Sequence, residues 1–195
     1  MPSDPRFAQS QLVLPDPTDI NALAIQQQFR NLQPWGLKVT QTLHSQTFVN
    51  GTTQQLGFDT LNYNNYQSLT RQKYSLAFNP ATLGGNLYPY AGITVPQTGI
   101  YRIRAVGNLL IASTVTQIVQ LICYIYINGS VVSFEDVVNP LLNLTDNTYF
   151  QCQDDLFLNA GDIVTIFLLI SESTLAANGI SGNTPRLNLR YLGPS

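Results

Sequence analysis

The stretch that decides the fold is Leu121-Ile122-Cys123-Tyr124-Ile125-Tyr126-Ile127-Asn128-Gly129. Seven apolar or aromatic residues in a row, rich in β-branched and aromatic side chains, predict a buried β-strand. The Asn-Gly pair that follows is a strong short-range signal of a hairpin turn. The segment Ile163-Val164-Thr165-Ile166-Phe167-Leu168-Leu169-Ile170 has the same apolar character. Both segments therefore predict strands.

On both sides of these segments, short strand patterns and turn signals fill the chain from about Val39 to Ser195. Many short strands without an intervening helical pattern favour a sandwich or a jelly roll. We therefore predict an all-β fold, an antiparallel jelly-roll sandwich, over residues 37–195. The predicted strands are Leu37–Leu43, Gln46–Val49, Gln54–Asp59, Ser75–Phe78, Gly92–Val95, Gly99–Leu110, Val119–Ile127, Thr148–Leu158, Ile163–Ile170 and Arg186–Tyr191.

The two apolar segments are apolar on both faces, which a single sandwich does not explain. A strand of an antiparallel sandwich normally turns one face to the core and the other to water. Tyr101–Ala105 alternates in this way and places Arg102 and Arg104 together, toward solvent or a pocket between subunits. Large apolar patches are rare on monomers and mark interfaces, so we predict that the doubly apolar strands meet other copies. Alternatively, an N-terminal helix or arm covers the second face.

Composition indicates a surface that is polar but hardly ionic. Charged residues make up 10% of the chain, against about 25% in a typical soluble domain, and Asn, Gln and Thr supply the remaining polarity. Neutral polar groups are buried at lower cost than ions, so we expect extensive contact with other proteins. An ordinary β-protein with a Thr- and Asn-rich surface would have a similar composition.

Neither nucleic acid nor a membrane is an expected partner. The net charge is −2 and the only lysines are Lys38 and Lys73, so no basic run is present to bind a phosphate backbone. No apolar run approaches the roughly 20 residues of a membrane span. The segment Met1–Gln11 is polar and proline-bearing, unlike a signal peptide. Cys123 and Cys152 are expected to be free buried thiols, or a disulfide if their strands are neighbours.

The N-terminal part has a different pattern. Residues 1–17 carry four prolines and few apolar residues, which is typical of an extended arm. Residues 18–33 lack Gly and Pro, and their apolar spacing predicts one short α-helix that ends before Pro34. We predict a division into residues 1–36, which attach to a shell or partner, and residues 37–195. The predicted attachment residues are Ile25, Phe29, Leu32 and Trp35.

No set of residues predicts catalysis. His44 is the only histidine, and no Gly-x-Ser-x-Gly elbow accompanies it, so we expect a surface residue at a strand end. Asp154 and Asp155 would point to opposite faces of a strand and would not act as a pair in glycoside hydrolysis. We therefore expect no enzyme, no cofactor and no metal. The alternatives are calcium binding at the acidic groups, which are Asp154-Asp155, Asp162 and Glu135-Asp136, and a glycan-processing enzyme. Hydrolysis that is abolished by Asp154→Asn would support the enzyme.

Four pieces in order resemble the jelly roll shared by tumour necrosis factor and the complement-type globular heads. They are Gly92–Tyr101, in which a strand ends at Pro and Gly and resumes at an aromatic residue, Tyr124–Gly129 with its Asn-Gly hairpin, Leu156–Val164 with Gly-Asp before a strand, and the closing strand Leu187–Gly193. Asn62–Tyr66 is weakly similar to an early loop of that family. The resemblance covers residues 40–195 and implies a compact homotrimer with the doubly apolar strands at its threefold axis. The interface residues that follow are Ile122, Tyr124, Tyr126, Val164, Ile166 and Leu168.

The sequence departs from the animal members because it lacks a signal sequence, a collagen stalk and a membrane anchor, so extracellular signalling is not expected. Trimeric jelly rolls that follow a short arm and helix look similar to virion proteins of tailed bacteriophages, an analogy of architecture only. By this analogy we expect a viral structural protein, made in the host cytoplasm, that binds the outer surface of a capsid as a cement or decoration protein. Its partners would be the major capsid protein or other virion subunits. The alternative is the receptor-binding tip of a tail or head fibre, whose loops would recognise a host surface glycan or protein.

Overall fold

The computed structural model describes residues 36–64, 77–110, 118–136, 148–172 and 180–194. The chain divides into two units, Met1–Gln33 and Pro34–Ser195, and all described residues belong to the second. In that described part, no helix is long and apolar enough to cross a membrane. The predicted arm and helix, with Ile25, Phe29, Leu32 and Trp35, lie outside the described residues.

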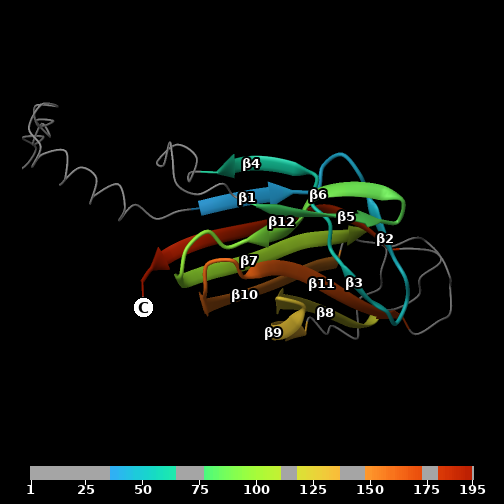
Figure 1. The fold of residues 1–195 in the computed structure, drawn as a ribbon. Helices are drawn as coiled ribbons and strands as arrows, with labels where there is room; N and C mark the ends of the chain where they lie inside the picture. Colours follow the sequence, from blue (N-terminus) through green and yellow to red (C-terminus); the bar gives the residue numbers. More distant parts are fainter. Residues whose placement is uncertain (1–35, 65–76, 111–117, 137–147, 173–179, 195) are drawn as a thin grey trace, which may run out of the picture. The chain divides into compact units, whose positions relative to one another are not determined.

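The described residues form two antiparallel sheets, whose strands are labelled in Figure 1. The first sheet has the order β10 (Thr148–Leu158), β7 (Gly99–Leu110), β12 (Ile180–Gly193), β1 (Gly36–Thr40) and β4 (Thr60–Asn64), and β2 (Gln46–Phe48) also pairs with β12. The second sheet has the order β5 (Phe78–Leu83), β6 (Asn86–Thr94), β11 (Ile163–Glu172), β8 (Ile118–Ile127) and β9 (Ser130–Asp136), and β3 (Thr53–Gln55) also pairs with β11. The prediction of an all-β antiparallel sandwich is confirmed for these residues.

The observed strands agree best with prediction where the apolar pattern is longest. β7 and β10 have the predicted bounds, and β8 and β11 differ from them by one or two residues at one end. Two observed strands, β4 and β9, are absent from the prediction. β9 is the second arm of the hairpin at Asn128-Gly129, whose φ angles of 52° and 81° match the positive values that a type I′ turn requires.

The core lies between the two sheets, and alternation along the strands builds it. In β7, Tyr101 and Ile103 are fully buried while Arg102 is exposed, so the predicted alternation is confirmed. Cys123 of β8 and Cys152 of β10 are buried free cysteines, and their Sγ atoms lie 2.7 Å apart. Since β8 and β10 belong to different sheets, this contact shows that the sheets pack face to face.

Side chains tie two turns together at one end of the second sheet. Asp162 accepts hydrogen bonds from Asn128 Nδ2 and from the backbone N–H of Asn159, each at 2.8 Å. The Oδ1 atom of Asn128 accepts one from the backbone N–H of Ile163 at 2.9 Å. Asn and Asp commonly satisfy turn backbones in this way. Asp162 therefore has a structural part in the fold.

Candidate functional site

The outer face of the second sheet, which points away from the core, carries a cluster of aromatic side chains. The register of the strands sets Tyr124 opposite both Phe134 and Phe167, and residues opposite each other on paired strands share one side of a sheet. The next outward pair along β8 and β11 is Ile122 with Leu169. We call this surface the aromatic face, and it consists of Ile122, Tyr124, Tyr126, Phe134, Phe167 and Leu169.

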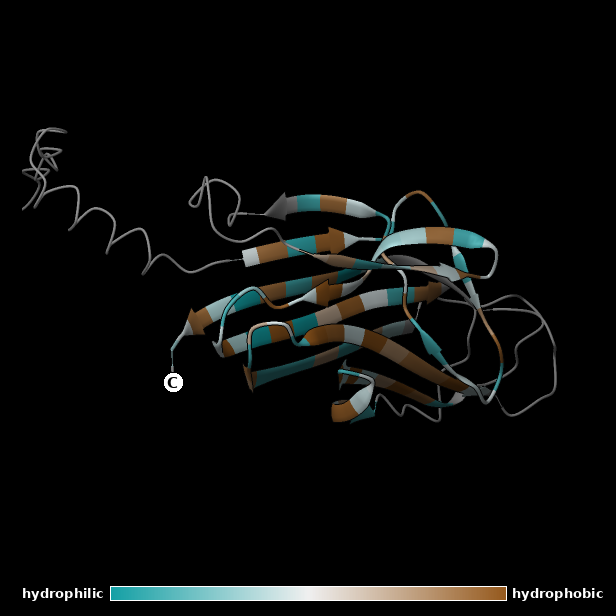
Figure 2. Ribbon diagram, viewed as in Figure 1, coloured by the Kyte–Doolittle hydropathy of each residue, from teal (hydrophilic) through white to brown (hydrophobic). Residues whose placement is uncertain are grey.

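The rings of the aromatic face contact one another. The ring centroids of Tyr126 and Phe167 lie 4.3 Å apart, and those of Tyr124 lie 6.1 Å from both Tyr126 and Phe134. The two separations of 6.1 Å fall in the range of about 4.5–7 Å that aromatic pairs prefer, and the Tyr126–Phe167 pair is slightly closer. Phe134 is 63% exposed, and β11 is brown along most of its length in Figure 2, as expected of a strand that is apolar on both sides. The cluster is thus a continuous, partly exposed apolar surface, which Asp136 borders opposite Ile122.

Half of the predicted interface residues lie on this face, and half do not. Ile122, Tyr124 and Tyr126 are on the outer side of β8. In contrast, Val164, Ile166 and Leu168 have no exposed surface and pack in the core of the same chain, so their assignment to an outer interface is wrong.

The error has a simple physical reason. β11 is apolar on both faces, so its hydrophobicity does not say which set of residues faces outward. The register with β8 sets Thr165 opposite Tyr126 and Phe167 opposite Tyr124, which gives the outer side to the odd-numbered residues. The interface prediction also omitted Phe134. The signal for Phe134 is the Asn-Gly turn, because a hairpin turn requires a second strand after it.

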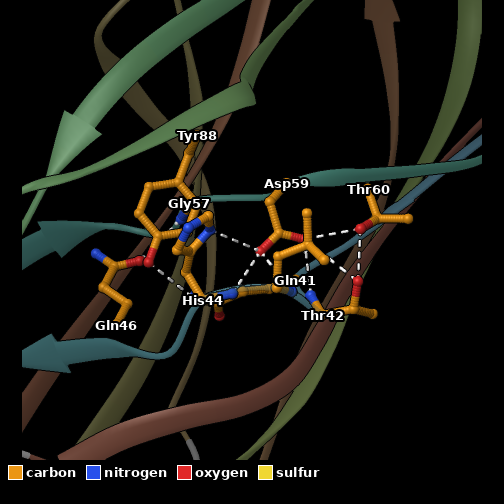
Figure 3. Close-up of polar contacts among 9 residues, drawn as sticks. Gln41, Thr42, His44, Gln46, Gly57, Asp59, Thr60 and Tyr88 are labelled. Atoms are coloured by element: carbon orange, nitrogen blue, oxygen red, sulfur yellow. Dashed lines mark hydrogen bonds and ion pairs between the residues drawn. The ribbon is translucent and has the colours of Figure 1, made fainter.

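A second cluster of polar groups surrounds Asp59, whose side chain is only 1% exposed. Its carboxylate accepts hydrogen bonds from the backbone N–H groups of Thr42, Leu43 and His44 at 2.8–2.9 Å and from the Thr60 hydroxyl at 2.8 Å (Figure 3). Burial disfavours the charged carboxylate, but these hydrogen bonds outweigh burial and hold the pKa of Asp59 below its usual value. The network fixes the loop that follows β1.

His44 lies beside this network without forming a catalytic arrangement. Its Nδ1 atom is 3.5 Å from Asp59 Oδ2, and its side chain is 40% exposed. The imidazole also makes an edge-on contact with the ring of Tyr88, with centroids 5.9 Å apart. Among the described residues, no hydroxyl or thiol forms a hydrogen bond with the imidazole. Within the part of the chain that the structure describes, this histidine therefore has no nucleophile to activate.

The paired acidic residues of β10 lie as the strand geometry predicts. Asp155 is opposite Arg102, and its two oxygens accept hydrogen bonds from that guanidinium at 2.8 and 2.6 Å. The Arg102 guanidinium holds the pKa of Asp155 below its usual value. Asp154 lies opposite Ile103, a core residue, so the two carboxylates do not converge.

No protein-family model matches this sequence, and no curated protein matches it. The two facing sheets and their strand order define a class, the antiparallel jelly-roll sandwiches. Within that class, the globular domain of the zebrafish complement 1qA protein is similar, with a TM-score of 0.50 and 10% identity over 83% of this chain and 99% of that chain. The Eiger TNF of S. frugiperda is similar with a TM-score of 0.50 and 11% identity, over 84% of this chain and 96% of that chain. At such low identity the likeness concerns the fold alone, and it confirms the predicted TNF-like jelly roll.

Proposed function

We propose that this chain is a non-catalytic binding subunit that assembles as a homotrimer through the aromatic face. The observation that carries the proposal is the face itself, where four aromatic rings lie beside Ile122 and Leu169, with Asp136 at its border opposite Ile122. Exposed apolar patches of this kind mark interaction surfaces. Tyr residues suit such a surface because the ring can be buried while the hydroxyl finds a polar partner.

The composition of the aromatic face favours another copy of the chain as its occupant. Interfaces of transient complexes are about as polar as the rest of a protein surface, whereas interfaces between identical subunits are more apolar. A closed threefold ring also needs two different patches in contact. The edge strand β9, with Val131 and Val132 each 46% exposed and Phe134 63% exposed, adjoins the broad surface of β8 and β11. The edge of one copy can therefore pack on the broad surface of the next.

The finer form of the proposal is a capsid cement protein on the outer surface of a bacteriophage. In that role the trimer would form a knob, and residues 1–36 would bind the major capsid protein or other virion subunits. The division of the chain after Gln33 supports a separate attachment segment. The low share of charged residues, 10%, supports extensive burial against other proteins.

Sedimentation equilibrium of the full chain tests the assembly. We expect a mass three times that of the 21.6 kDa chain. Phe167→Asp is expected to give a folded monomer, because the trimer would bury an unpaired charge. Thr82→Asp is a matched control, since Thr82 is exposed opposite Leu87 in the same sheet but lies outside the aromatic face; this variant should remain trimeric. A parent chain that sediments as a monomer contradicts the proposal.

The virion role has a separate test. Labelled full-length chain is added to purified phage capsids that lack it, and the bound copies are located by electron microscopy. We expect binding spread over the capsid surface and its loss in Phe29→Asp, with Gln27→Asp as the control within the same predicted helix. Copies confined to fibre tips would favour the receptor-binding alternative, and chains that bind no part of the particle would refute a virion role.

A further inference from the structure

The outer face of the first sheet has a character opposite to that of the aromatic face. It gathers five of the nine Lys and Arg residues of the chain, namely Lys38, Arg102, Arg104, Arg186 and Arg190. The register sets Arg190 opposite Arg102 and places Lys38 and Arg104 in one row across β12, so they share one side of the sheet. Like charges in such proximity oppose folding. Their concentration in a chain with few charges therefore indicates a function outside stability.

Most of these cations have no partner within the described part of the molecule. Arg102 forms the bidentate pair with Asp155. Among the described residues, Lys38, Arg104, Arg186 and Arg190 form no ion pair. Positive groups that are near each other and unpaired attract an external anion.

Three of the unpaired cations border a single groove. The groove has a volume of about 880 Å³, and its lining includes Lys38, Arg104 and Arg186 together with Asn108, Gln151 and Tyr149. Tyr149 is 67% exposed, so its ring is available to a ligand. The volume lies within the range of about 300–1,000 Å³ that small-molecule sites occupy. Arg190 lies on the same face but does not line the groove.

We propose that this groove binds an acidic saccharide, a short sugar chain that carries carboxylate or sulfate groups. Guanidinium groups bind such planar or multi-oxygen anions through paired hydrogen bonds. The side-chain amides of Asn108 and Gln151 offer donors and acceptors for ring hydroxyls. An exposed Tyr ring such as Tyr149 provides a flat apolar surface with a polar tip, which suits the less polar face of a sugar ring.

The residues on the other wall of the groove favour a saccharide over a nucleic acid as the ligand. Glu135 and Asp136 also line the groove, and Glu135 accepts a hydrogen bond from Gln151 Nε2 at 3.3 Å. Two carboxylates repel any anion, and a chain of phosphates, whose binding depends on the number of charges neutralised, has few hydroxyl donors with which to offset that repulsion. The same carboxylates can accept hydrogen bonds from sugar hydroxyls. The mixture of cations and carboxylates therefore favours a ligand that has both anionic groups and many hydroxyls.

The inference names a ligand class for the proposed binding function, but it does not require the trimer. The groove is lined mainly by the first sheet, with Glu135 and Asp136 of β9 on its other wall. The residues varied in the two tests belong to different sheets, Arg104 and Arg186 to the first and Phe167 to the second. Loss of one property should therefore leave the other intact, and the two proposals can fail separately.

Isothermal titration of the full chain with defined probes tests the site. The acidic probes are trigalacturonate, which carries carboxylates, and a heparin-derived hexasaccharide, which carries sulfates. The neutral probe is the methyl ester of trigalacturonate, and an oligothymidylate of matched charge represents nucleic acid. We expect at least one acidic saccharide to bind, and the methyl ester and the oligothymidylate to bind at least about tenfold more weakly, since a hydrogen bond to an ionised group is stronger than one to a neutral group.

Variants locate the binding. Arg104→Gln and Arg186→Gln are expected to weaken binding of the acidic saccharide by about tenfold or more, while Arg190→Gln, on the same face outside the groove, leaves it unchanged. Each variant is checked by sedimentation, and an unchanged mass shows that the assembly is not the cause. The inference is overturned if neither acidic probe binds, if the oligothymidylate or the neutral ester binds as tightly, or if Arg190→Gln costs as much as Arg104→Gln.

Discussion

Ile166 and Phe167 are consecutive residues of β11, and both are large and apolar, yet they belong to different surfaces. Ile166 has no exposed surface and packs in the core between the sheets. Phe167 contacts Tyr126 on the aromatic face. The inner surface of the second sheet is closed by the first sheet of the same chain, whereas we propose that its outer surface is closed by another copy. Hydrophobicity along a strand therefore does not separate residues that specify the fold from residues that specify assembly.

The largest expected effect is the loss of the fold when a charge is placed on the inner surface. Ile166→Asp would bury an unpaired carboxylate in the core, so we expect a chain without the β-sheet signal in far-ultraviolet circular dichroism. The milder Ile166→Ala is expected to lower the free energy of unfolding by about 2–5 kcal/mol, measured by urea denaturation at fixed chain concentration. Thr165→Ala, one residue away on the outer side, is the control. A folded Ile166→Asp variant would contradict the division between the two surfaces.

Sequence reasoning succeeds for the fold because the strands are long and the turns are well marked. Gly99–Leu110 and Thr148–Leu158 alternate or run apolar between clear turn residues, and both strands have the predicted bounds. The assignment of outer residues fails in β11, because both of its faces are apolar and only the register with β8 separates them.

The aromatic face and the groove depend on features that the sequence does not display. A register shift lies between Ile125 and Tyr126 in the pairing of β8 with β9. Because of this bulge, Tyr124 lies opposite Phe134, whereas simple counting back from the Asn-Gly turn would pair it with Ser133. The groove brings together Lys38, Arg104 and Arg186, which are far apart in the chain. The sequence predicts that Arg102 and Arg104 share a face, but the strand order supplies the rest.

The reactivity of the Cys123 thiol, on the inner side of β8, reports whether the inner surface is closed. Burial, aided by the neighbouring Cys152, raises the pKa of the Cys123 thiol well above its ordinary value, and the thiolate is the reactive form. We expect Cys123 and Cys152 to remain unlabelled by a maleimide in the native protein and to react at once in urea, as measured by intact mass.

A cysteine introduced at Tyr124, the residue after Cys123, probes the outer surface, because the two native cysteines are expected not to react. Tyr124→Cys is expected to label rapidly in the monomeric Phe167→Asp background and slowly in a chain that still forms trimers. Equal labelling in both backgrounds would mean that the aromatic face stays open. Native labelling of Cys123 would mean that the inner surface is not closed as the structure shows.

The response to acid should act on the fold through Asp59, whose carboxylate is buried. Hydrogen bonds hold the pKa of Asp59 in the folded protein below its usual value, which is about 3.9 in an unfolded chain. The stabilisation that Asp59 supplies is therefore complete above about pH 4 and is lost as the pH falls through its lower folded-state pKa. Asp59→Asn is expected to lower the free energy of unfolding by about 1–3 kcal/mol at neutral pH.

The measurement is a series of urea unfolding curves from neutral pH to about pH 2. The stability of Asp59→Asn should fall less steeply than that of the parent below about pH 4, where the parent loses the contribution of Asp59. Curves that remain parallel over this range would show that the Asp59 network does not sense acid. Asp155→Asn serves as the matched control, because its carboxylate also has a lowered pKa but is exposed to water.

The smallest effect is expected for Asp155→Asn. The Arg102–Asp155 pair has good geometry, but the two side chains are 46% and 40% exposed. Water and salt screen such pairs, and many contribute nothing measurable. Asp155→Asn should therefore leave the urea midpoint and the sedimenting mass unchanged at physiological salt. A clear loss of stability would mean that the outer face of the first sheet helps to specify the fold, so an outward position would not by itself mark a residue as free for binding. An unchanged urea midpoint would show that the charged groups of that face, like Phe167, lie on a surface that the fold does not need.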